Sequence, residues 1–303
     1  MSELHTPVLA EQVVQWLRIR PQGIYIDATV GLGGHALEIA RRLTTGRLMG
    51  MDRDPRALDI ARERLREYER QVILVHANFS RIEDVARGLK LPPADGVLAD
   101  LGVSSMQLDS PERGFSFRFA GPLDMRMDAD AQETAAEIVN HWSEEDLADL
   151  LYRNADERAS RRIARAIVRE RPIRDTEHLA TVVAGAQKKR GRQKLHPATK
   201  TFLALRIAVN RESEELQQFL TRTPATLSLT GRWVVLSYHS IEDRLVKHGF
   251  RQLAQEGVLK ILTKKPIQPA AEEVRANPRA RSAKMRVAER AASQYAPAES
   301  LMP

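Results

Sequence analysis

The sequence predicts an α/β protein with a doubly wound sheet of seven strands and a helical insertion. Three features of the 303-residue chain support this fold class. Short apolar runs alternate with amphipathic stretches over residues 1–100, strand-like runs return after residue 230, and residues 107–199 contain none. Strands and helices that alternate in this way form a mostly parallel sheet with helices on both faces, connected right-handedly.

Seven apolar segments have the length and composition of buried strands. They are residues 23–30, 47–51, 72–76, 95–100, 232–237, 259–262 and 284–288. We expect the first five strands to run parallel and the last two to form a terminal antiparallel pair.

Helices are expected between the strands, over residues 36–43 and 55–68, after residue 80 and from about residue 241. Asp54 suits an N-cap and Pro55 the first helical position. Ser80 and Glu83 have the spacing of a capping box. Each of these features marks the start of a helix that follows a strand.

Helical patterns also fill the region without strands, at residues 142–153 and 157–169. A long amphipathic helix over residues 200–220 then leads back to the sheet. These patterns predict one discontinuous domain of residues 1–106 and 200–303, and an inserted helical domain of residues 107–199.

Composition limits the class of protein and of partner. The formal net charge is +7 and the pI about 9.8, which favours a polyanionic partner because cations that contact phosphates release counterions; a merely basic enzyme is the alternative. The chain has no cysteine, which excludes disulfides, thiolate catalysis and Cys-ligated metals. The first 30 residues lack the apolar segment of a signal peptide, and no run approaches the ~18 apolar residues of a membrane span. We therefore expect a cytoplasmic protein.

A glycine-rich loop follows the first strand. Gly31, Gly33 and Gly34 precede a helix, whose first N–H groups and positive dipole end attract a ligand. Asp52 ends the second strand, where a carboxylate can accept both ribose hydroxyls of an adenosine. The order of strand, loop, helix, strand and acid favours a nucleoside cofactor over a structural turn.

Asp27 distinguishes between two such cofactors. The loop also satisfies the dinucleotide-binding pattern, with Ala36 in the last position. However, a carboxylate four residues before Gly31 would repel a pyrophosphate, whereas it could hold the cationic ammonium of a methionine moiety. S-adenosylmethionine therefore fits better than a nicotinamide dinucleotide. The alternative role of Asp27 is a capping carboxylate that holds the loop.

The fourth strand ends at Asp100, which Ser104 and Ser105 follow. Ligands of open α/β sheets bind at this edge. The acceptor of a methyl group can be an aromatic amine, which is a poor nucleophile until a carboxylate or hydroxyl orients its protons. Asp100, Ser104 and Ser105 are placed for this task; alternatively, Asp100 binds the cofactor and the serines cap a turn.

His239 and Ser240 end the fifth strand on the same edge. Tyr238, Asp243 and Arg244 lie beside them, so polar side chains are denser here than capping requires. We expect a catalytic or substrate-positioning role for His239. The alternative is a simple cap formed by Ser240 with Asp243.

Two groups of basic residues are candidates for an RNA channel, with a solvated surface as the alternative. The first group is Lys188, Lys189, Arg190, Arg192 and Lys194, and the second is Lys264, Lys265, Arg275, Arg279, Arg281, Lys284 and Arg286. Phe115, Phe117 and Phe119 could stack on an unpaired base. Their alternation also fits a strand packed on the core.

These residues lie in motifs that resemble those of the bacterial 16S ribosomal RNA cytosine N4-methyltransferases, the MraW or RsmH family. The resemblance covers nearly the whole chain, and its most specific segments are Gly121–Asp128 and Ser237–Arg244. It also includes His5–Leu9, Asp27–His35, Asp52–Pro55, Asp100–Ser105, Arg113–Phe117, His196–Phe202 and Asn277–Ser282. Tyr238 departs from the family pattern, in which phenylalanine is usual. The motif after strand four lacks the prolines found in many amine methyltransferases, which disfavours a catalytic role for Asp100.

The resemblance implies a Rossmann-like, class I methyltransferase domain with a helical substrate-recognition insertion, located in the cytoplasm. It implies methyl transfer from S-adenosylmethionine to N4 of a cytidine in the decoding region of 16S ribosomal RNA, within the small subunit; whether the protein is a homodimer stays open. The cofactor contacts carried over by motif are Gly33, Gly34, His35, Asp52, Phe79, Asp100 and Gln107, of which Phe79 and Gln107 rest on the resemblance alone. The candidates around the acceptor amine are Asp100, Ser104 and His239, and no metal site is expected.

Two other functions compete with methyl transfer. A nicotinamide oxidoreductase could use the same glycine loop, although Asp27 disfavours it. A non-catalytic RNA-binding or assembly protein could retain a vestigial cofactor pocket, although intact Gly33, Asp52 and Asp100 disfavour decay. Binding of adenosylhomocysteine without nicotinamide would exclude the first alternative, and turnover would exclude the second.

Overall fold

The computed structural model of the chain describes residues 7–128, 131–187 and 196–291, with the side chain of Ser105 left out. The chain divides into two compact units. The sheet unit comprises Met1–Gly102 and Glu214–Pro303, and the helical unit comprises Val103–Ser213. The sequence-based boundaries were 106/107 and 199/200, so the structure differs most at the second boundary, where the helix after residue 199 belongs to the helical unit.

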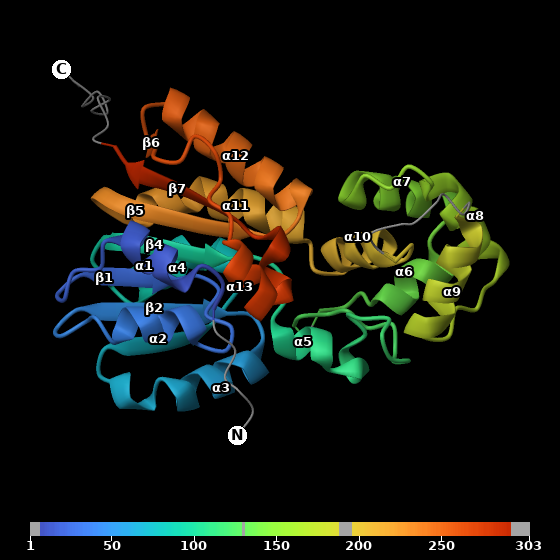
Figure 1. Cartoon of the computed structure of the whole chain (residues 1–303), viewed down its shortest axis with the longest axis horizontal. Coiled ribbons are helices and arrows are strands. Elements are labelled where there is room, and N and C mark those ends of the chain that lie inside the picture. Colours follow the sequence, from blue (N-terminus) through green and yellow to red (C-terminus); the bar gives the residue numbers. More distant parts are fainter. Residues whose placement is uncertain (1–6, 129–130, 188–195, 292–303) are drawn as a thin grey trace, which may run out of the picture. The chain divides into compact units, whose positions relative to one another are not determined.

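The sheet unit contains a seven-stranded sheet in the order β3-β2-β1-β4-β5-β7-β6. The strands are β1 (Ile24–Asp27), β2 (Arg47–Asp52), β3 (Val72–His76), β4 (Ala94–Asp100), β5 (Leu227–Ser237), β6 (Leu259–Ile261) and β7 (Lys284–Arg290). Neighbouring strands from β3 to β5 pair in parallel, whereas β7 pairs antiparallel with both β5 and β6. The predicted Rossmann-like, doubly wound sheet with a terminal antiparallel pair is therefore confirmed (Figure 1).

Helices cover both faces of this sheet because successive strand residues point to opposite sides. Tyr25 and Leu48 belong to an apolar layer that α1 (Ala10–Leu17), α2 (Gly34–Ala40) and α3 (Pro55–Arg64) cover. Their neighbours Ile26 and Met49 belong to the opposite layer, under α4 (Ile82–Gly88), α11 (Glu212–Thr226) and α12 (Ser240–Gln255). The remaining helix of this unit is α13 (Ala271–Ala276). The central strands β1, β2, β4 and β5 are largely buried on both faces, so they read as continuous apolar runs in the sequence.

The helix starts of the sheet unit were predicted with mixed success. Asp54 caps α3, because its side chain accepts a hydrogen bond from the backbone of Arg56. The capping box of Ser80 and Glu83 is wrong. Ser80 lies inside a short 3₁₀ turn that is capped by Asn78, and α4 begins at residue 82 without a side-chain cap.

The helical unit is built around its own apolar core. Its helices are α5 (Ser105–Asp109), α6 (Ala135–His141), α7 (Glu144–Ala155), α8 (Ser160–Arg169), α9 (Thr176–Ala186) and α10 (Thr199–Val209). Leu151, Ile163, Leu179 and Phe202 are buried together in this core. The described residues of the unit form no strand, as the sequence predicts.

The predicted single helix over residues 200–220 is wrong, because it is two helices that break at Asn210 and Arg211. Arg211 has a left-handed backbone, with φ of 50°. The buried Asn210 side chain accepts a hydrogen bond from the Met127 amide at 2.8 Å and donates one to the Met125 carbonyl at 2.7 Å. Asn210 therefore ties the end of α10 to the loop before α6.

The strand that the alternation of Phe115, Phe117 and Phe119 also fitted is absent from the described structure. Phe115 is buried, Phe117 packs between His196 and Phe202, and Phe119 is exposed. Of these three rings, Phe119 is therefore the one left accessible for stacking. In the described part of the chain, no helix has the length and apolarity that crossing a membrane requires.

Candidate active site

The loop between β1 and α2 packs tightly on one side and is open on the other. Gly31 and Gly33 both have positive φ, 50° and 79°, which favours glycine. A Cβ on Gly33 would lie 3.3 Å from the Cα of Ala61 in α3, so the helix holds the loop closely. A Cβ on Gly31 would meet only the Thr29 carbonyl, at 3.9 Å. The backbone near Gly31 is therefore the side on which a ligand can approach.

Asp52 is held at the end of β2 by two backbone amides. Its Oδ2 accepts from Gly31 at 2.8 Å and its Oδ1 accepts from Asp54 at 2.9 Å. Burial raises the pKa of Asp52, and these two hydrogen bonds counteract the rise. Each carboxylate oxygen can accept a further hydrogen bond, so the residue can still bind a diol.

Asp27 and His35 are buried polar groups whose hydrogen-bonding capacity is not fully used. Asp27 is 1% exposed; its Oδ1 accepts from Thr29 at 3.2 Å, but its Oδ2 has no hydrogen-bond partner among the described residues. His35 is 6% exposed, and neither of its ring nitrogens has such a partner. Buried polar atoms without partners are rare in folded proteins. These atoms therefore indicate a polar ligand at the carboxyl edge of β1.

Burial raises the pKa of Asp27 to about 7, although the nearby His35 lowers it. Asp100 and Asp52 contribute to the rise through like-charge repulsion. A cation placed beside this group of carboxylates would favour their ionised forms. The electrostatics of the edge therefore favour a ligand that carries positive charge.

Asp100 joins the ends of three strands. Its backbone amide donates to the Thr29 hydroxyl at 2.6 Å, and its Oδ1 accepts from the Tyr238 hydroxyl at 2.8 Å. Its Oδ2 lies 3.6 Å from the Nε2 of His35. Burial raises the pKa of Tyr238 well above its usual value, with Asp100 adding to the rise, so the hydroxyl remains a proton donor. The sequence did not indicate the bond between Tyr238 and Asp100.

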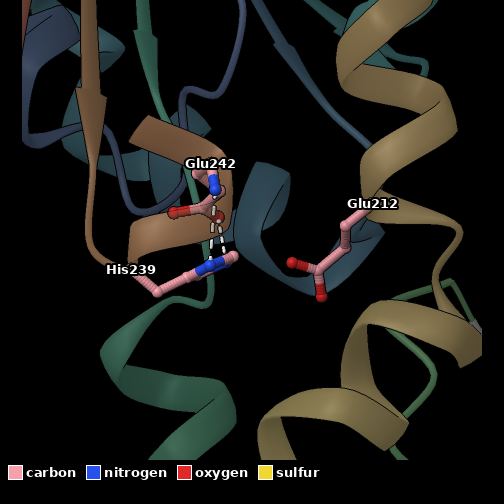
Figure 2. A group of neighbouring side chains, drawn as sticks. All are labelled: Glu212, His239 and Glu242. Carbon is pink, nitrogen blue, oxygen red and sulfur yellow. Dashed lines mark hydrogen bonds and ion pairs between the residues drawn. The ribbon is translucent and has the colours of Figure 1, made fainter. Parts of the chain in front are cut away.

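His239 is the N-cap of α12, so the alternative interpretation, a cap formed by Ser240 with Asp243, is wrong. Its Nδ1 accepts from the Glu242 amide at 3.4 Å, and its Nε2 lies 3.0 Å from the Glu242 Oε1 without hydrogen-bond alignment. Figure 2 shows these two side chains facing one another. Glu212, also drawn there, belongs to the helical unit, where both of its carboxylate oxygens accept from Arg206 at 2.8 Å.

Part of the second basic group has a structural role. Asp243 accepts from Arg286 at 2.7 Å and from Lys284 at 3.1 Å, which ties α12 to β7. Burial tends to raise the pKa of Asp243, but these two cations lower it overall. Arg286 and Lys284 therefore already have an anionic partner, whereas Lys264 and Lys265 are exposed. The first basic group, residues 188–194, lies outside the described residues.

Phe79 begins the short 3₁₀ turn that follows β3, at the same edge as Asp52. Its ring meets that of Phe219 edge to face, with centroids 5.2 Å apart and planes at 89°. The ring is half-buried, so one surface of it remains available for stacking.

Ser104 and Gln107 belong to the helical unit, where they form a capping box at the start of α5. The Ser104 hydroxyl accepts from the Gln107 amide at 3.2 Å, and the Gln107 Oε1 accepts from the Ser104 amide at 3.0 Å. This geometry is the cap that the sequence left as the alternative role of Ser104. A catalytic role for its hydroxyl remains a prediction.

Comparison with known proteins identifies the family. A family model described as the MraW methylase family matches residues 2–291. The chain belongs to this family. This confirms the resemblance noted from the motifs and, with it, methyl transfer as the chemistry of the family.

Curated relatives match along almost their full lengths, and all three described here are named ribosomal RNA small subunit methyltransferase H. The protein of Solibacter usitatus is 51% identical over 286 residues, which cover 94% of this chain and 99% of the relative. That of a Cyanothece species is 52% identical over 287 residues, covering 95% of each chain. That of Koribacter versatilis is 49% identical over 296 residues, covering 94% of each chain.

Proposed function

We propose that this protein transfers a methyl group from S-adenosylmethionine to the exocyclic N4 amine of a cytidine in 16S ribosomal RNA, within the small subunit and in the cytoplasm. The structural observation that carries the proposal is the cluster of Asp27, His35 and Asp100 beside the glycine loop. Asp27 and His35 are buried and have polar atoms without a hydrogen-bond partner among the described residues, and the carboxylates of Asp27 and Asp100 give the cluster a surplus of negative charge. The family and the names of the relatives support ribosomal RNA as the substrate.

The chain's residues fit the parts of this cofactor. Asp27 would bind the ammonium of the methionine moiety, and Asp52 the ribose hydroxyls. Phe79 would pack on the adenine. When bound, S-adenosylmethionine supplies an electrophilic methyl group on a positively charged sulfur. The other contacts assigned by motif are Gly33, Gly34, His35, Asp100 and Gln107.

Asp100 is the residue best suited to act on the acceptor amine. An exocyclic amine that gains a methyl group must lose one proton, and its lone pair must first be directed at the methyl carbon. The Asp100 carboxylate can accept an N–H hydrogen bond and then the proton, because Tyr238 and Thr29 hold it in place. Alignment of the reacting atoms would supply most of the rate acceleration. We assign His239 and Ser104 to positioning of the substrate.

The same cluster disfavours a nicotinamide dinucleotide. A pyrophosphate carries negative charge, and the buried Asp27 next to the loop would repel it. We therefore expect the purified protein to bind adenosylhomocysteine and to show no affinity for NAD or NADP.

The test is methyl transfer from labelled S-adenosylmethionine to small ribosomal subunits that lack the modification, followed by nucleoside mass analysis. We expect N4-methylcytidine at a single nucleotide. Asp100→Asn should lower kcat much more than it weakens adenosylhomocysteine binding, for which Asp100 is one of several assigned contacts. Asp95→Asn is the matched control, because Asp95 lies at the opposite end of β4 and pairs with Arg20.

Two results would contradict the proposal. A methyl group on another nucleoside or another atom would overturn the cytidine N4 assignment. Absence of label on both subunits and free 16S RNA, with adenosylhomocysteine binding intact, would favour the non-catalytic alternative instead.

A further inference from the structure

Helix α8 presents a row of arginines to solvent. Arg161, Arg162, Arg165 and Arg169 are all exposed, and their spacing of one, four and eight residues from the first places them on one helical face. The opposite face carries Ile163 and Ile167, which are buried in the core of the helical unit. We call the four exposed side chains the α8 arginine face; it extends about 12 Å along the helix. None of these residues belongs to the basic groups found from the sequence.

In several other helices of the described chain, an exposed arginine pairs with a carboxylate three or four residues earlier. Such pairs are Arg42 with Glu38, Arg62 with Asp59, Arg87 with Glu83, Arg153 with Asp149 and Arg275 with Glu272. Helix α8 contains no acidic residue between Ser160 and Arg169. Within the described structure, Arg161 and Arg162 make no ion pair.

The two remaining arginines of the face have weak partners. Arg165 lies 3.3 Å from Glu144, and Arg169 lies 3.3 Å from Glu170. Their side chains are 74% and 76% exposed, and ion pairs as exposed as these contribute little. Both guanidinium groups therefore remain available to an external anion.

The arrangement is unfavourable for the isolated helix. Arg161, Arg165 and Arg169 follow one another at intervals of four residues, where like charges repel. Arg161 and Arg162 also lie in the first turn, where the helix dipole disfavours cations. Leu, Gln or Glu would suit the helix as well or better. A polyanionic partner would turn this unfavourable charge density into binding energy.

We propose that the α8 arginine face binds the phosphate backbone of the substrate RNA. The inference rests on the proposed function, because that function supplies an RNA partner. Guanidinium groups match phosphate oxygens with two parallel hydrogen bonds, and their contacts release counterions. Contacts of this kind fix the orientation of an RNA and carry no base specificity. The face would therefore hold the substrate, while the carboxyl edge of the sheet acts on the base.

The test variant is Arg161→Gln/Arg162→Gln/Arg165→Gln, which removes three charges and retains good helix formers. The matched control is Arg47→Gln/Arg70→Gln/Lys90→Gln. These three exposed residues lie at or just before the amino ends of β2, β3 and β4, on the edge of the sheet opposite the candidate site. Adenosylhomocysteine binding of both variants should match the wild type, and their unfolding temperatures should be no lower than that of the wild type, which excludes misfolding as a cause.

The measurement is filter binding of an unmodified 16S ribosomal RNA transcript over a range of KCl concentrations. Each phosphate contact contributes about 0.7 to 0.9 to the slope of log K against log salt, so the triple variant should have a slope shallower by about 2 to 3. Its affinity near 0.1 M salt should fall by about tenfold or more, whereas the control should change by less than about threefold. With subunits as substrate, KM should rise and kcat should stay near the wild-type value.

Three outcomes would overturn the inference. The slope and affinity of the variant could equal those of the wild type, or the control could lose as much affinity as the variant. Alternatively, the variant could lose affinity for assembled subunits and not for the naked transcript, which would indicate a protein partner. The proposed function is judged separately. Wild-type protein that binds the transcript but does not methylate subunits would refute the proposed function. The assignment of the α8 arginine face would then still be decided by the salt dependence of transcript binding.

Discussion

Replacing Asp27 with asparagine separates the cost of burying a carboxyl group from its use in cofactor binding. The carboxyl group is 1% exposed, and burial raises its pKa to about 7. Asparagine has the same shape and can still accept the hydrogen bond from Thr29, but it carries no charge. We expect the variant to be more stable than the wild type without cofactor and to bind the cofactor less well.

The size of the stability effect follows from the pKa. A rise from 3.8 to about 7 corresponds to about 4 kcal/mol at a pH above both values. The new amide nitrogen would replace Oδ2, which has no hydrogen-bond partner among the described residues. Burying this unpaired amide would reduce the gain in the free energy of unfolding by about 1–3 kcal/mol. The net gain at about pH 8 should therefore be about 1–3 kcal/mol.

The pH dependence of the free energy of unfolding is a second test of whether Asp27 destabilises the free protein. Because the folded-state pKa of Asp27 is raised, the wild type loses stability as the pH rises from about 4 through about 7. Asparagine does not titrate, so its advantage should shrink by about 2 kcal/mol when the pH is lowered from about 8 to about 5.5. Urea unfolding of both proteins at these two pH values, without cofactor, measures the difference.

Cofactor binding should change in the opposite direction. Loss of a charged hydrogen bond to the ammonium predicts a Kd for adenosylhomocysteine that is about ten- to a hundredfold weaker. Wild-type binding should strengthen between about pH 6 and about pH 7.5 as Asp27 ionises, and the variant should lack this dependence. An asparagine variant that is no more stable at pH 8 and binds as tightly as the wild type would refute the reasoning.

Three further substitutions test other parts of the molecule. Tyr238→Phe removes the hydroxyl that donates to Asp100, so kcat should fall by about tenfold with little change in adenosylhomocysteine affinity, as steady-state kinetics and calorimetry would show. Phe79→Ala should weaken adenosylhomocysteine binding by about tenfold, and unchanged affinity would exclude the adenine contact. The same substitution should destabilise the sheet unit by about 1–2 kcal/mol, less than the loss of a fully buried ring would. Asn210→Ala should cost about 2–4 kcal/mol in urea unfolding, because two buried backbone groups lose their partner.

The strands of the sheet unit were predictable because each is a short run of apolar residues, including the edge strand β3, which is only partly buried. Val72–His76 was predicted without error, and β1, β2 and β4 differ from their predicted bounds only at the ends. Caps were less predictable, because several nearby side chains can compete for the same amide. Asn78 is the cap where Ser80 was expected, and His239 is the cap where Ser240 was the alternative interpretation.

The break between α10 and α11 shows why a local pattern can mislead. Apolar residues continue at helical spacing through residues 200–220, so periodicity alone predicts one helix. The decisive contact is between Asn210 and the backbone of Met125 and Met127, more than eighty residues earlier in the chain. No window of local sequence contains that information, and the left-handed Arg211 follows from it.

The candidate site shows the same division between local and long-range information. Asp52 could be assigned from its place after a strand, since the loop and the acid lie on neighbouring parallel strands. The link between Tyr238 and Asp100 could not, because it joins residues 138 positions apart in sequence. The sequence feature associated with this hydrogen bond is that Tyr238 stands where the family usually has phenylalanine, and that feature does not identify the partner.

Stability and function oppose one another at the carboxyl edge of this sheet. Asp27, Asp52 and Asp100 come from three adjacent strand ends, and the charges of the other two raise the pKa of Asp27. Such repulsion lowers the stability of the free protein, and it is relieved either by protonation of Asp27 or by a cation among the carboxylates. Relief of the repulsion therefore contributes to the affinity for a cationic ligand. A ligand that binds only the folded state raises the free energy of unfolding in proportion to the logarithm of the ratio of ligand concentration to Kd. A cofactor with a positively charged ammonium should therefore raise the unfolding temperature more than adenosine, which has the ribose and adenine but no ammonium.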